Sequence, residues 1–165
     1  MRIYGLVQDS IVDGPGLRFV CFVQGCPHHC PGCHNPDSHD PAGGTEMTTD
    51  EVISRMLSNP LTDGLTLSGG EPFEQADDCM VIARAAHDNG LNVWCYTGYT
   101  YDHLLRHGTP VQIALLAEVD VLIDGRYEES KRSLSLDWRG SSNQRVIDMN
   151  REDHFRGGTK LMEVK

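Results

Sequence analysis

The sequence predicts an α/β protein built on a mostly parallel sheet, and three observations lead to that prediction. Short apolar runs typical of buried strands alternate with amphipathic segments of helical period. Such alternation indicates parallel strands joined by crossover helices. Polar or glycine-containing turns follow the strands. The 165 residues suit a single domain, 1–165, but a full eight-stranded barrel takes about 200–250 residues, so we expect an incomplete barrel or an open curved sheet.

The first part of the chain contains two expected strands around a glycine-rich turn. Residues 2–7 alternate weakly and predict an edge strand. Residues 12–16, Val-Asp-Gly-Pro-Gly, have the composition of a turn. Residues 17–24 form a nearly continuous apolar run, which is typical of a strand buried on both faces. A cysteine-rich loop, residues 25–36, follows directly at the carboxyl end of that strand.

The rest of the chain alternates helices with strands. Thr48 and Glu51 have the spacing of a capping box and predict the start of a helix. Gly90 stands where a helix over residues 75–89 needs its C′ residue. Further strands are expected at 65–68, 91–97, 119–123 and 144–148, with further helices after Thr100 and at 111–117.

The composition argues against several classes of function. The net charge is −10, with an isoelectric point near 5.1 and no cluster of Lys or Arg, whereas nucleic-acid binding needs a basic face. No apolar run is long enough to span a membrane, and no secretory signal is visible at the N-terminus. Six cysteines without an export signal indicate free thiols or metal ligands in a reducing, cytoplasmic setting.

Three of the six cysteines form a compact C-x3-C-x2-C motif at Cys26, Cys30 and Cys33. Thiolates favour zinc and iron–sulfur clusters over hard cations. A cluster of four irons normally takes four cysteines, and no fourth cysteine belongs to this group. Three thiolates would therefore leave one iron open to a ligand that is not protein. The alternative is a structural zinc loop, in which His28, His29 or His34 supplies the fourth ligand.

The next motif is Gly69-Gly70-Glu71-Pro72, directly after the expected strand at 65–68. It can be a simple tight turn, but two glycines also let the backbone approach a ligand closely. Glu71 could accept a hydrogen bond from an ammonium group. In parallel sheets, ligands bind outside the carboxyl ends of the strands. The cysteine loop, this motif, Thr97-Gly98 and Asp124-Gly125 all follow expected strands, which favours one shared site.

These motifs together resemble the radical S-adenosylmethionine (SAM) superfamily. Within it, the chain resembles the family of activating proteins of anaerobic ribonucleoside-triphosphate reductase over nearly its whole length. Longer glycyl-radical activases, such as the one for pyruvate formate-lyase, share the front half. The matching stretches are 13–18, the cysteine loop with Asn35, 67–72, 93–99, 120–125 and, most specifically, 138–145 (Trp-Arg-Gly-Ser-Ser-Asn-Gln-Arg).

The resemblance implies a fold, cofactors, a reaction and a partner. The fold is a partial TIM-like β/α barrel. Cys26, Cys30 and Cys33 would hold one [4Fe-4S] cluster per chain. The open iron would bind SAM, whose cleavage yields a 5′-deoxyadenosyl radical that takes hydrogen from a glycine of the large reductase subunit. No side chain need act as an acid or base. The electron would come from a low-potential donor such as reduced flavodoxin. The implied SAM-binding residues are Gly32, Cys33, His34, Gly69, Gly70 and Glu71.

One departure and two rival readings accompany this resemblance. The superfamily commonly has an aromatic residue after the third cysteine, near adenine, where this chain has His34. One rival is a radical SAM enzyme with another target, either a different glycyl-radical enzyme or a small molecule. The run 139–145 argues against both targets. The second rival is a non-catalytic zinc-binding module.

The remaining candidates have plainer expectations. Asp124 is expected either to bind ligand or to form a turn. The run 139–145 is too polar for a core, and its composition alone favours an exposed, disordered tail. The resemblance and the position of the run after the fourth core strand lead us instead to expect an ordered segment near the mouth of the site. We expect three cysteines to be buried in the core as small hydrophobes, namely Cys21, Cys79 and Cys95. We expect four histidines with polar sequence neighbours to be solvated, namely His87, His103, His107 and His154.

Overall fold

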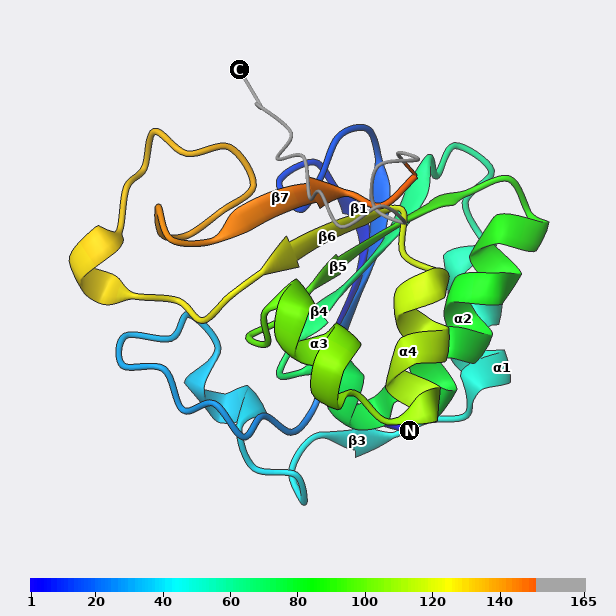
Figure 1. Ribbon diagram of the computed structural model, residues 1–165. Helices are drawn as coiled ribbons and strands as arrows, with labels where there is room; N and C mark the ends of the chain where they lie inside the picture. Colours follow the sequence, from blue (N-terminus) through cyan, green and yellow to red (C-terminus); the bar gives the residue numbers. More distant parts are fainter. Residues whose placement is uncertain (151–165) are drawn as a thin grey trace.

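A computed structural model of the chain describes residues 1–150 and shows one seven-stranded mixed sheet with helices packed on one face (Figure 1). The predicted α/β class is confirmed. The strands lie in the order β3-β1-β2-β4-β5-β6-β7. Their bounds are Arg2–Ser10 (β1), Arg18–Val23 (β2), Thr45–Glu46 (β3), Gly64–Gly69 (β4), Asn92–Tyr96 (β5), Val121–Asp124 (β6) and Arg145–Asp148 (β7).

The centre of the sheet is parallel, because β2, β4, β5 and β6 pair in that orientation. β1 and β7 run antiparallel to their neighbours, while β3 pairs antiparallel with β1 and so points the same way as β2. The sheet is therefore mostly parallel, as predicted. The finer expectation of a partial barrel stays a prediction. The central strands are almost entirely buried, as their continuous apolar runs indicated.

In the described part of the chain, residues 1–150, four α-helices connect the strands: α1 (Thr49–Met56), α2 (Ala76–Asp88), α3 (Tyr101–His107) and α4 (Pro110–Ala117). Three short 3-10 helices lie at Pro36–Ser38, Pro72–Gln75 and Glu129–Lys131. Thr48 caps α1 in the predicted capping box with Glu51, and Thr100 caps α3. Gly90 follows α2 with φ +76°, as expected for a residue that must turn left-handed after a helix. No helix within residues 1–150 is both long and apolar enough to cross a membrane.

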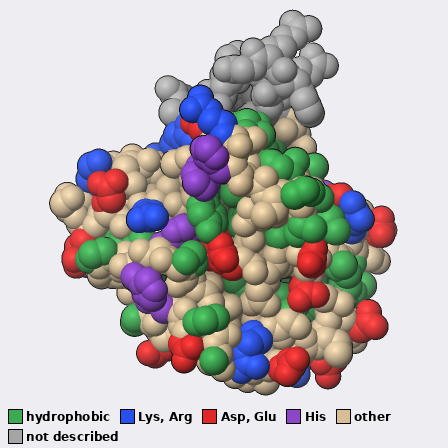
Figure 2. Space-filling model, turned by 60° about the horizontal axis from the view of Figure 1, so that its bottom comes forward, with side chains coloured by type: hydrophobic (Ala, Val, Ile, Leu, Met, Phe, Trp, Pro, Cys, Tyr) green, Lys and Arg blue, Asp and Glu red, His purple; other side chains and the backbone are tan. Residues whose placement is uncertain are grey.

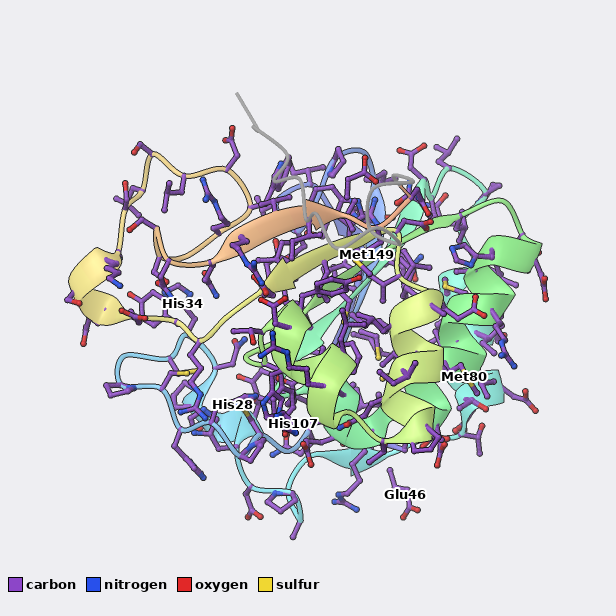
Figure 3. The ribbon with its side chains drawn as sticks, viewed as in Figure 1. His28, His34, Glu46, Met80, His107 and Met149 are labelled. Carbon is purple, nitrogen blue, oxygen red and sulfur yellow. The ribbon has the colours of Figure 1, made fainter. Side chains whose placement is uncertain are left out.

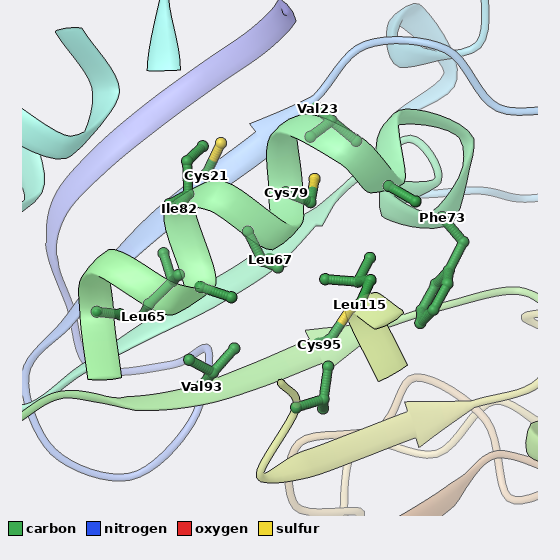
Figure 4. Close-up of a cluster of buried hydrophobic side chains, with 14 of the residues drawn as sticks. Cys21, Val23, Leu65, Leu67, Phe73, Cys79, Ile82, Val93, Cys95 and Leu115 are labelled. Carbon is green, nitrogen blue, oxygen red and sulfur yellow. The ribbon is translucent and has the colours of Figure 1, made fainter. Parts of the chain in front are cut away.

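The main core lies between this helical layer and the sheet (Figure 4). Ile82 of α2 packs with Leu67 of β4 and with neighbouring side chains of β2, β5 and α4. Cys21, Cys79 and Cys95 are completely buried in this core, so their predicted role as small hydrophobes is confirmed. Burial raises the pKa of the Cys21 thiol to about 12, and it also raises the pKa values of Cys79 and Cys95.

The opposite face of the sheet contains a buried cation. Arg18 has no exposed surface, and its guanidinium donates to Thr66 Oγ1 at 2.7 Å and to the carbonyl of Leu65 at 2.7 Å. Its charge lies 5.5 Å from the centre of the Trp94 ring, which meets Trp138 edge to face. Burial lowers the pKa of Arg18 to about 10, and nearby tyrosine and aspartate side chains offset part of that effect.

Asp124, at the end of β6, has a structural role in the fold. Asp124 is buried, forms an ion pair with Arg145 and accepts the backbone N–H of Tyr101 at 2.8 Å. Asp124 therefore connects β6 to β7 and to the start of α3, and these contacts explain why an aspartate stands at this strand end.

His103 and His107 are exposed as predicted, and His154 lies outside the described residues.

Candidate functional site

A cavity of about 600 Å³ opens at the carboxyl ends of the central strands. The cysteine loop and the segment after β6 lie at this same end of the sheet (Figure 1). The size lies within the range of small-molecule sites. The predicted convergence of strand-end motifs on one site is confirmed, since the cavity wall includes Cys26, Cys30, Cys33, His34, Gly69, Gly70, Thr97, Gly98 and Gly125.

The three motif cysteines lie partly exposed on the wall of this cavity. The loop is fixed at its root by backbone hydrogen bonds from Gly25 to Ser38 and from Cys26 to His39. Burial raises the pKa of Cys26 to about 11, although the backbone of His28 hydrogen-bonds to the thiol and opposes the shift. Burial likewise raises the pKa of Cys30. Because metals bind thiolates, loading this site must release protons.

The two glycines of the GGEP motif allow a close approach between backbone segments. A Cβ on Gly69 would lie 2.5 Å from the backbone nitrogen of Val23, and Gly69 has φ +100°. A Cβ on Gly70 would lie 2.3 Å from the carbonyl oxygen of Gly25. These glycines therefore let the end of β4 pack directly against the root of the cysteine loop, in addition to lining the cavity.

Glu71 is completely buried, and its carboxylate is surrounded by donors. One oxygen accepts the Thr97 hydroxyl at 2.8 Å and the backbone N–H of Phe73 at 3.1 Å. The other oxygen accepts the backbone N–H of Gly98 at 2.8 Å and lies 2.7 Å from His28 Nε2. Four partners balance the cost of burying this carboxylate. Its expected contact with a ligand's ammonium group stays a prediction.

His28 connects the cysteine loop to this buried carboxylate. Its side chain is only 4% exposed, and its ring meets Tyr99 edge to face with centroids 4.6 Å apart (Figure 3 labels His28). Gly98 leaves room for the ring, because a Cβ there would lie 2.3 Å from His28 Cδ2. His28 thus lies in a prepared slot between two strand ends, and it also lines the cavity.

The segment after β6 covers the other side of the cysteine loop. Tyr127 lies on the cavity wall with its ring centroid 5.0 Å from that of His34. The carboxylate of Glu129 lies against Gly32, where a Cβ would come within 2.8 Å of the carboxyl carbon. His34 itself is exposed. Figure 2 shows several histidine side chains at the surface of the molecule. Gly32 and His34 are thus held between their own loop and this segment.

The polar run 139–145 is an ordered part of this wall, as expected. Gln144 Oε1 accepts the backbone N–H of Gly140 at 2.9 Å and that of Ser141 at 3.2 Å, while its Nε2 donates to the carbonyl of Gly125. Asn143 Nδ2 donates to the carbonyl of Arg126 at 2.8 Å. The polar side chains thus satisfy backbone groups of two loops, which explains a run that is polar yet folded.

The donor set fits a cluster with three thiolate ligands. Within residues 1–150, no three Cys, His, Asp or Glu side chains converge on one point as a single metal ion requires. Each thiolate of a cubane cluster would bind a different iron, and the three free cysteines of this loop supply three such ligands. His28, the most buried histidine of the loop, is bonded to Glu71 and not to a cysteine.

The sequence indicates His28 only as a possible zinc ligand and Gln144 only as one member of the polar run 139–145, and it gives no signal for Tyr127. A histidine between two ligating cysteines carries no signal of a distant carboxylate partner. The sequence places Gly98 at a strand-end turn, but a glycine that makes room for an imidazole looks the same in sequence as a turn glycine. The partnership depends on how three strand ends meet in space.

A comparison with protein families defines the class. The sequence model described as "4Fe-4S single cluster domain" matches residues 12–147, a span that includes every motif discussed above. The chain is therefore an iron–sulfur protein with one cluster domain. This match sets aside the zinc-binding module.

Curated relatives define the family. The chain is 33% identical over 154 residues to the anaerobic ribonucleoside-triphosphate reductase-activating protein of Salmonella typhimurium, and 35% identical over 156 residues to that of Escherichia coli K12. Each alignment covers 88% of this chain and 97% of the relative. The protein of the same name from phage T4 is 36% identical over 152 residues, with 88% and 90% covered. The chain belongs to the family of anaerobic ribonucleoside-triphosphate reductase-activating proteins.

Proposed function

We propose that this protein activates anaerobic ribonucleoside-triphosphate reductase by radical SAM chemistry. The observation that carries the proposal is the cavity itself, where three partly exposed cysteines of a C-x3-C-x2-C loop face the glycines of the GGEP motif. When bound, a [4Fe-4S] cluster and SAM would together supply the adenosyl radical that removes hydrogen from a glycine of the large reductase subunit. The relatives' names supply the target.

In this proposal the chain's own residues hold, orient and shield the reactants. Cys26, Cys30 and Cys33 would hold three irons of the cluster and would leave the fourth for the amino and carboxylate groups of SAM. Gly69 and Gly70, which line the cavity at the end of β4, would border the methionine part of SAM, with Glu71 next in the chain. Gly32, Cys33 and His34 border the adenine side. Precise orientation matters because hydrogen transfer needs close contact between the reacting atoms.

The fold and the setting follow from the same proposal. The sheet and its helices form the partial β/α barrel of the radical SAM type within a single domain, 1–165. The electron donor is a low-potential protein such as reduced flavodoxin. A reducing cytosol suits this chemistry, since unpaired thiols persist there.

A second candidate function is the activation of another glycyl-radical enzyme, such as pyruvate formate-lyase. The ordered run 139–145 argues against it, because this segment builds part of the cavity wall and belongs to the family-specific part of the sequence. The two candidates share the same cofactor chemistry and differ in the partner.

The test of the shared chemistry is a SAM-cleavage assay. Protein reconstituted anaerobically with iron and sulfide is mixed with SAM and dithionite, and 5′-deoxyadenosine and methionine are quantified by chromatography. Both products should appear in equal amounts and should depend on reductant. A brown, cluster-loaded protein that leaves SAM intact, with and without the reductase, would overturn the proposal.

A further inference from the structure

A second cavity lies beside the cysteine loop, and the proposed function does not use it. Its volume is about 790 Å³, and its wall comes from the start of β1, the root of the cysteine loop, the turn 40–43 and the 3-10 helix Pro72–Gln75. The first cavity has the segment after β6 in its wall instead. In Figure 1 the cysteine loop lies between that segment and β3. The loop therefore borders two cavities with different walls.

The two cavities share one of the predicted cluster ligands. Cys26 lines both of them, whereas Cys30 and Cys33 line the first cavity only. An electron passes efficiently only over a short distance, so the molecule that supplies it must come close to a cluster ligand. Of the three predicted ligands, Cys26 alone can be approached from the second cavity while SAM occupies the first. The second cavity thus offers an entry for electrons that does not compete with SAM.

The floor of the second cavity is fixed by a network of hydrogen bonds. Gln24 is only 3% exposed, and its Nε2 donates to the carbonyls of Asp37 at 2.9 Å and Asp40 at 2.7 Å. Gln75 Nε2 donates to the carbonyls of Arg2 and Gln24, both at 2.8 Å. These bonds join β1, the end of β2 and the turn after the cysteine loop. The cavity is therefore preformed, and a partner that enters it has little to order.

The charged groups of the second cavity do not favour an anionic ligand. Within residues 1–150, Arg2 is the only Lys or Arg side chain in the wall. Its guanidinium already donates to three backbone carbonyls of the turn before β3, at residues 42–44. The carboxylates of Asp40 and Glu74 also line the cavity. A free nucleotide or phosphate would meet these carboxylates without an unengaged arginine to bind it.

The rings in the wall suit a flat aromatic group. Pro27, Pro36 and Pro41 are exposed there. The rings of His29 and His39 also line the cavity and meet edge to face, with centroids 5.1 Å apart. Such rings can pack against the edge of a planar cofactor. Small interfaces are typical of transient electron-transfer partners, so a recess of this size is sufficient for one.

We propose that the second cavity is the docking site of the protein that reduces the cluster, a low-potential flavoprotein that places the exposed edge of its flavin beside Cys26. This inference rests on the proposed function, because it needs a reducible cluster on the cysteine loop. One electron leaves the anionic, fully reduced flavin and enters the cluster. The flavin is left as a neutral radical, so no proton and no atom is transferred.

The test fills the second cavity without changing a predicted cluster ligand. Pro41→Trp and Glu74→Trp each place a large side chain on a different wall of the cavity. Leu61→Trp is the matched control, because Leu61 is 72% exposed between α1 and β4 and lines neither cavity. Cluster-loaded samples of equal iron content are mixed anaerobically with fully reduced flavodoxin or with dithionite. Stopped-flow absorbance in the visible range follows the reduction of the cluster.

Flavodoxin should reduce Pro41→Trp and Glu74→Trp more slowly than the wild type, by about tenfold or more, as expected when a central part of an interface is blocked. Dithionite should reduce all four proteins at the same rate, because a small reductant does not need the docking site. Leu61→Trp should match the wild type with both reductants. Full rates with flavodoxin in both filled variants would overturn the proposal. Equal slowing with dithionite would also overturn it, because the defect would then lie in the cluster.

The two reductants separate this inference from the function on which it rests. If dithionite reduces the wild-type cluster and SAM stays intact, with and without the reductase, the radical SAM function fails. If the wild type cleaves SAM and both filled variants accept electrons from flavodoxin at the full rate, the function stands and the docking site fails. If dithionite supports cleavage but flavodoxin cannot reduce the wild-type cluster, the assignment of a flavoprotein to this cavity is wrong.

Discussion

The two groups of cysteines in this chain show how position decides the role of a side chain. Cys21, Cys79 and Cys95 are completely buried between the helices and the sheet, among aliphatic side chains. The other three lie partly exposed on one loop, at the wall of a cavity. Burial raises the pKa of thiols in both groups, so acidity does not separate them. What separates them is access to a shared open space.

The largest expected effect comes from exchanging members of these two groups for alanine. Alanine at position 26, 30 or 33 should abolish a stable cluster, because each thiolate holds one iron. Alanine at position 21, 79 or 95 should leave iron content unchanged and lower the free energy of unfolding by about 1–2 kcal/mol through a small cavity. Iron per chain and chemical denaturation measure both. A core variant that folds but cannot hold iron would break the comparison.

The next effect tests the contact between the GGEP motif and the cysteine loop. Gly70→Ala places a Cβ against the carbonyl of Gly25, so it should cost about 3 kcal/mol and also lower cluster content. Gly90→Ala is the matched control, since its Cβ would meet nothing within 4 Å. It should lose only about 1 kcal/mol of stability, because alanine is strained at the left-handed φ of +76°. Equal losses of stability with full iron in both variants would mean that the two loops are independent.

A smaller effect is expected at the buried carboxylate. Glu71→Gln keeps the shape, but either orientation of the amide turns its NH2 group toward a backbone N–H that now lacks an acceptor. The expected loss is about 2 kcal/mol of unfolding free energy. Glu74→Gln, at an exposed site in the short 3-10 helix Pro72–Gln75, should change stability by less than about 0.5 kcal/mol, because its amide oxygen can still accept the surface hydrogen bond from the Tyr99 hydroxyl. Denaturant titration measures the free energy of unfolding of both variants. Equal losses in Glu71→Gln and Glu74→Gln would show that the hydrogen bonds of the buried carboxylate do not stabilise the fold.

The sequence predicted much of the fold because its signals are local. The buried run at 17–24, the capping box at Thr48 and the C′ glycine at position 90 each depend on neighbouring residues only. The cysteine motif is also local, as its ligands lie on one loop. The bond between His28 and Glu71 spans 43 residues and joins two loops, so no local pattern announces it.

The smallest effect lies far from the cavity, at His87. The side chain is one-third exposed and hydrogen-bonds to Glu118 and to Asp120. Burial alone lowers the pKa of His87, but bonds and charges from these two carboxylates outweigh it and raise the pKa above its ordinary value. A raised pKa stabilises the fold fully below the unfolded pKa near 6.5, and this contribution disappears as pH rises through the folded pKa.

The pH dependence can be measured against His87→Gln. The wild type should be more stable than the variant by about 0.5 kcal/mol at pH 6, a small value because solvent screens the partly exposed pairs. The difference should shrink toward pH 9. A difference that grew with pH would contradict the raised pKa. Neither protein should differ in iron content, since His87 lies on α2 outside the cavity wall.

The most direct test of the central claim is whether this protein generates a radical on its partner. Cluster-loaded protein, SAM and a strong reductant are incubated anaerobically with anaerobic ribonucleoside-triphosphate reductase, and the mixture is examined by electron paramagnetic resonance. The account predicts a glycyl-radical signal that requires SAM and disappears with Cys30→Ala. No signal with this reductase, together with a strong signal when pyruvate formate-lyase replaces it, would contradict the account.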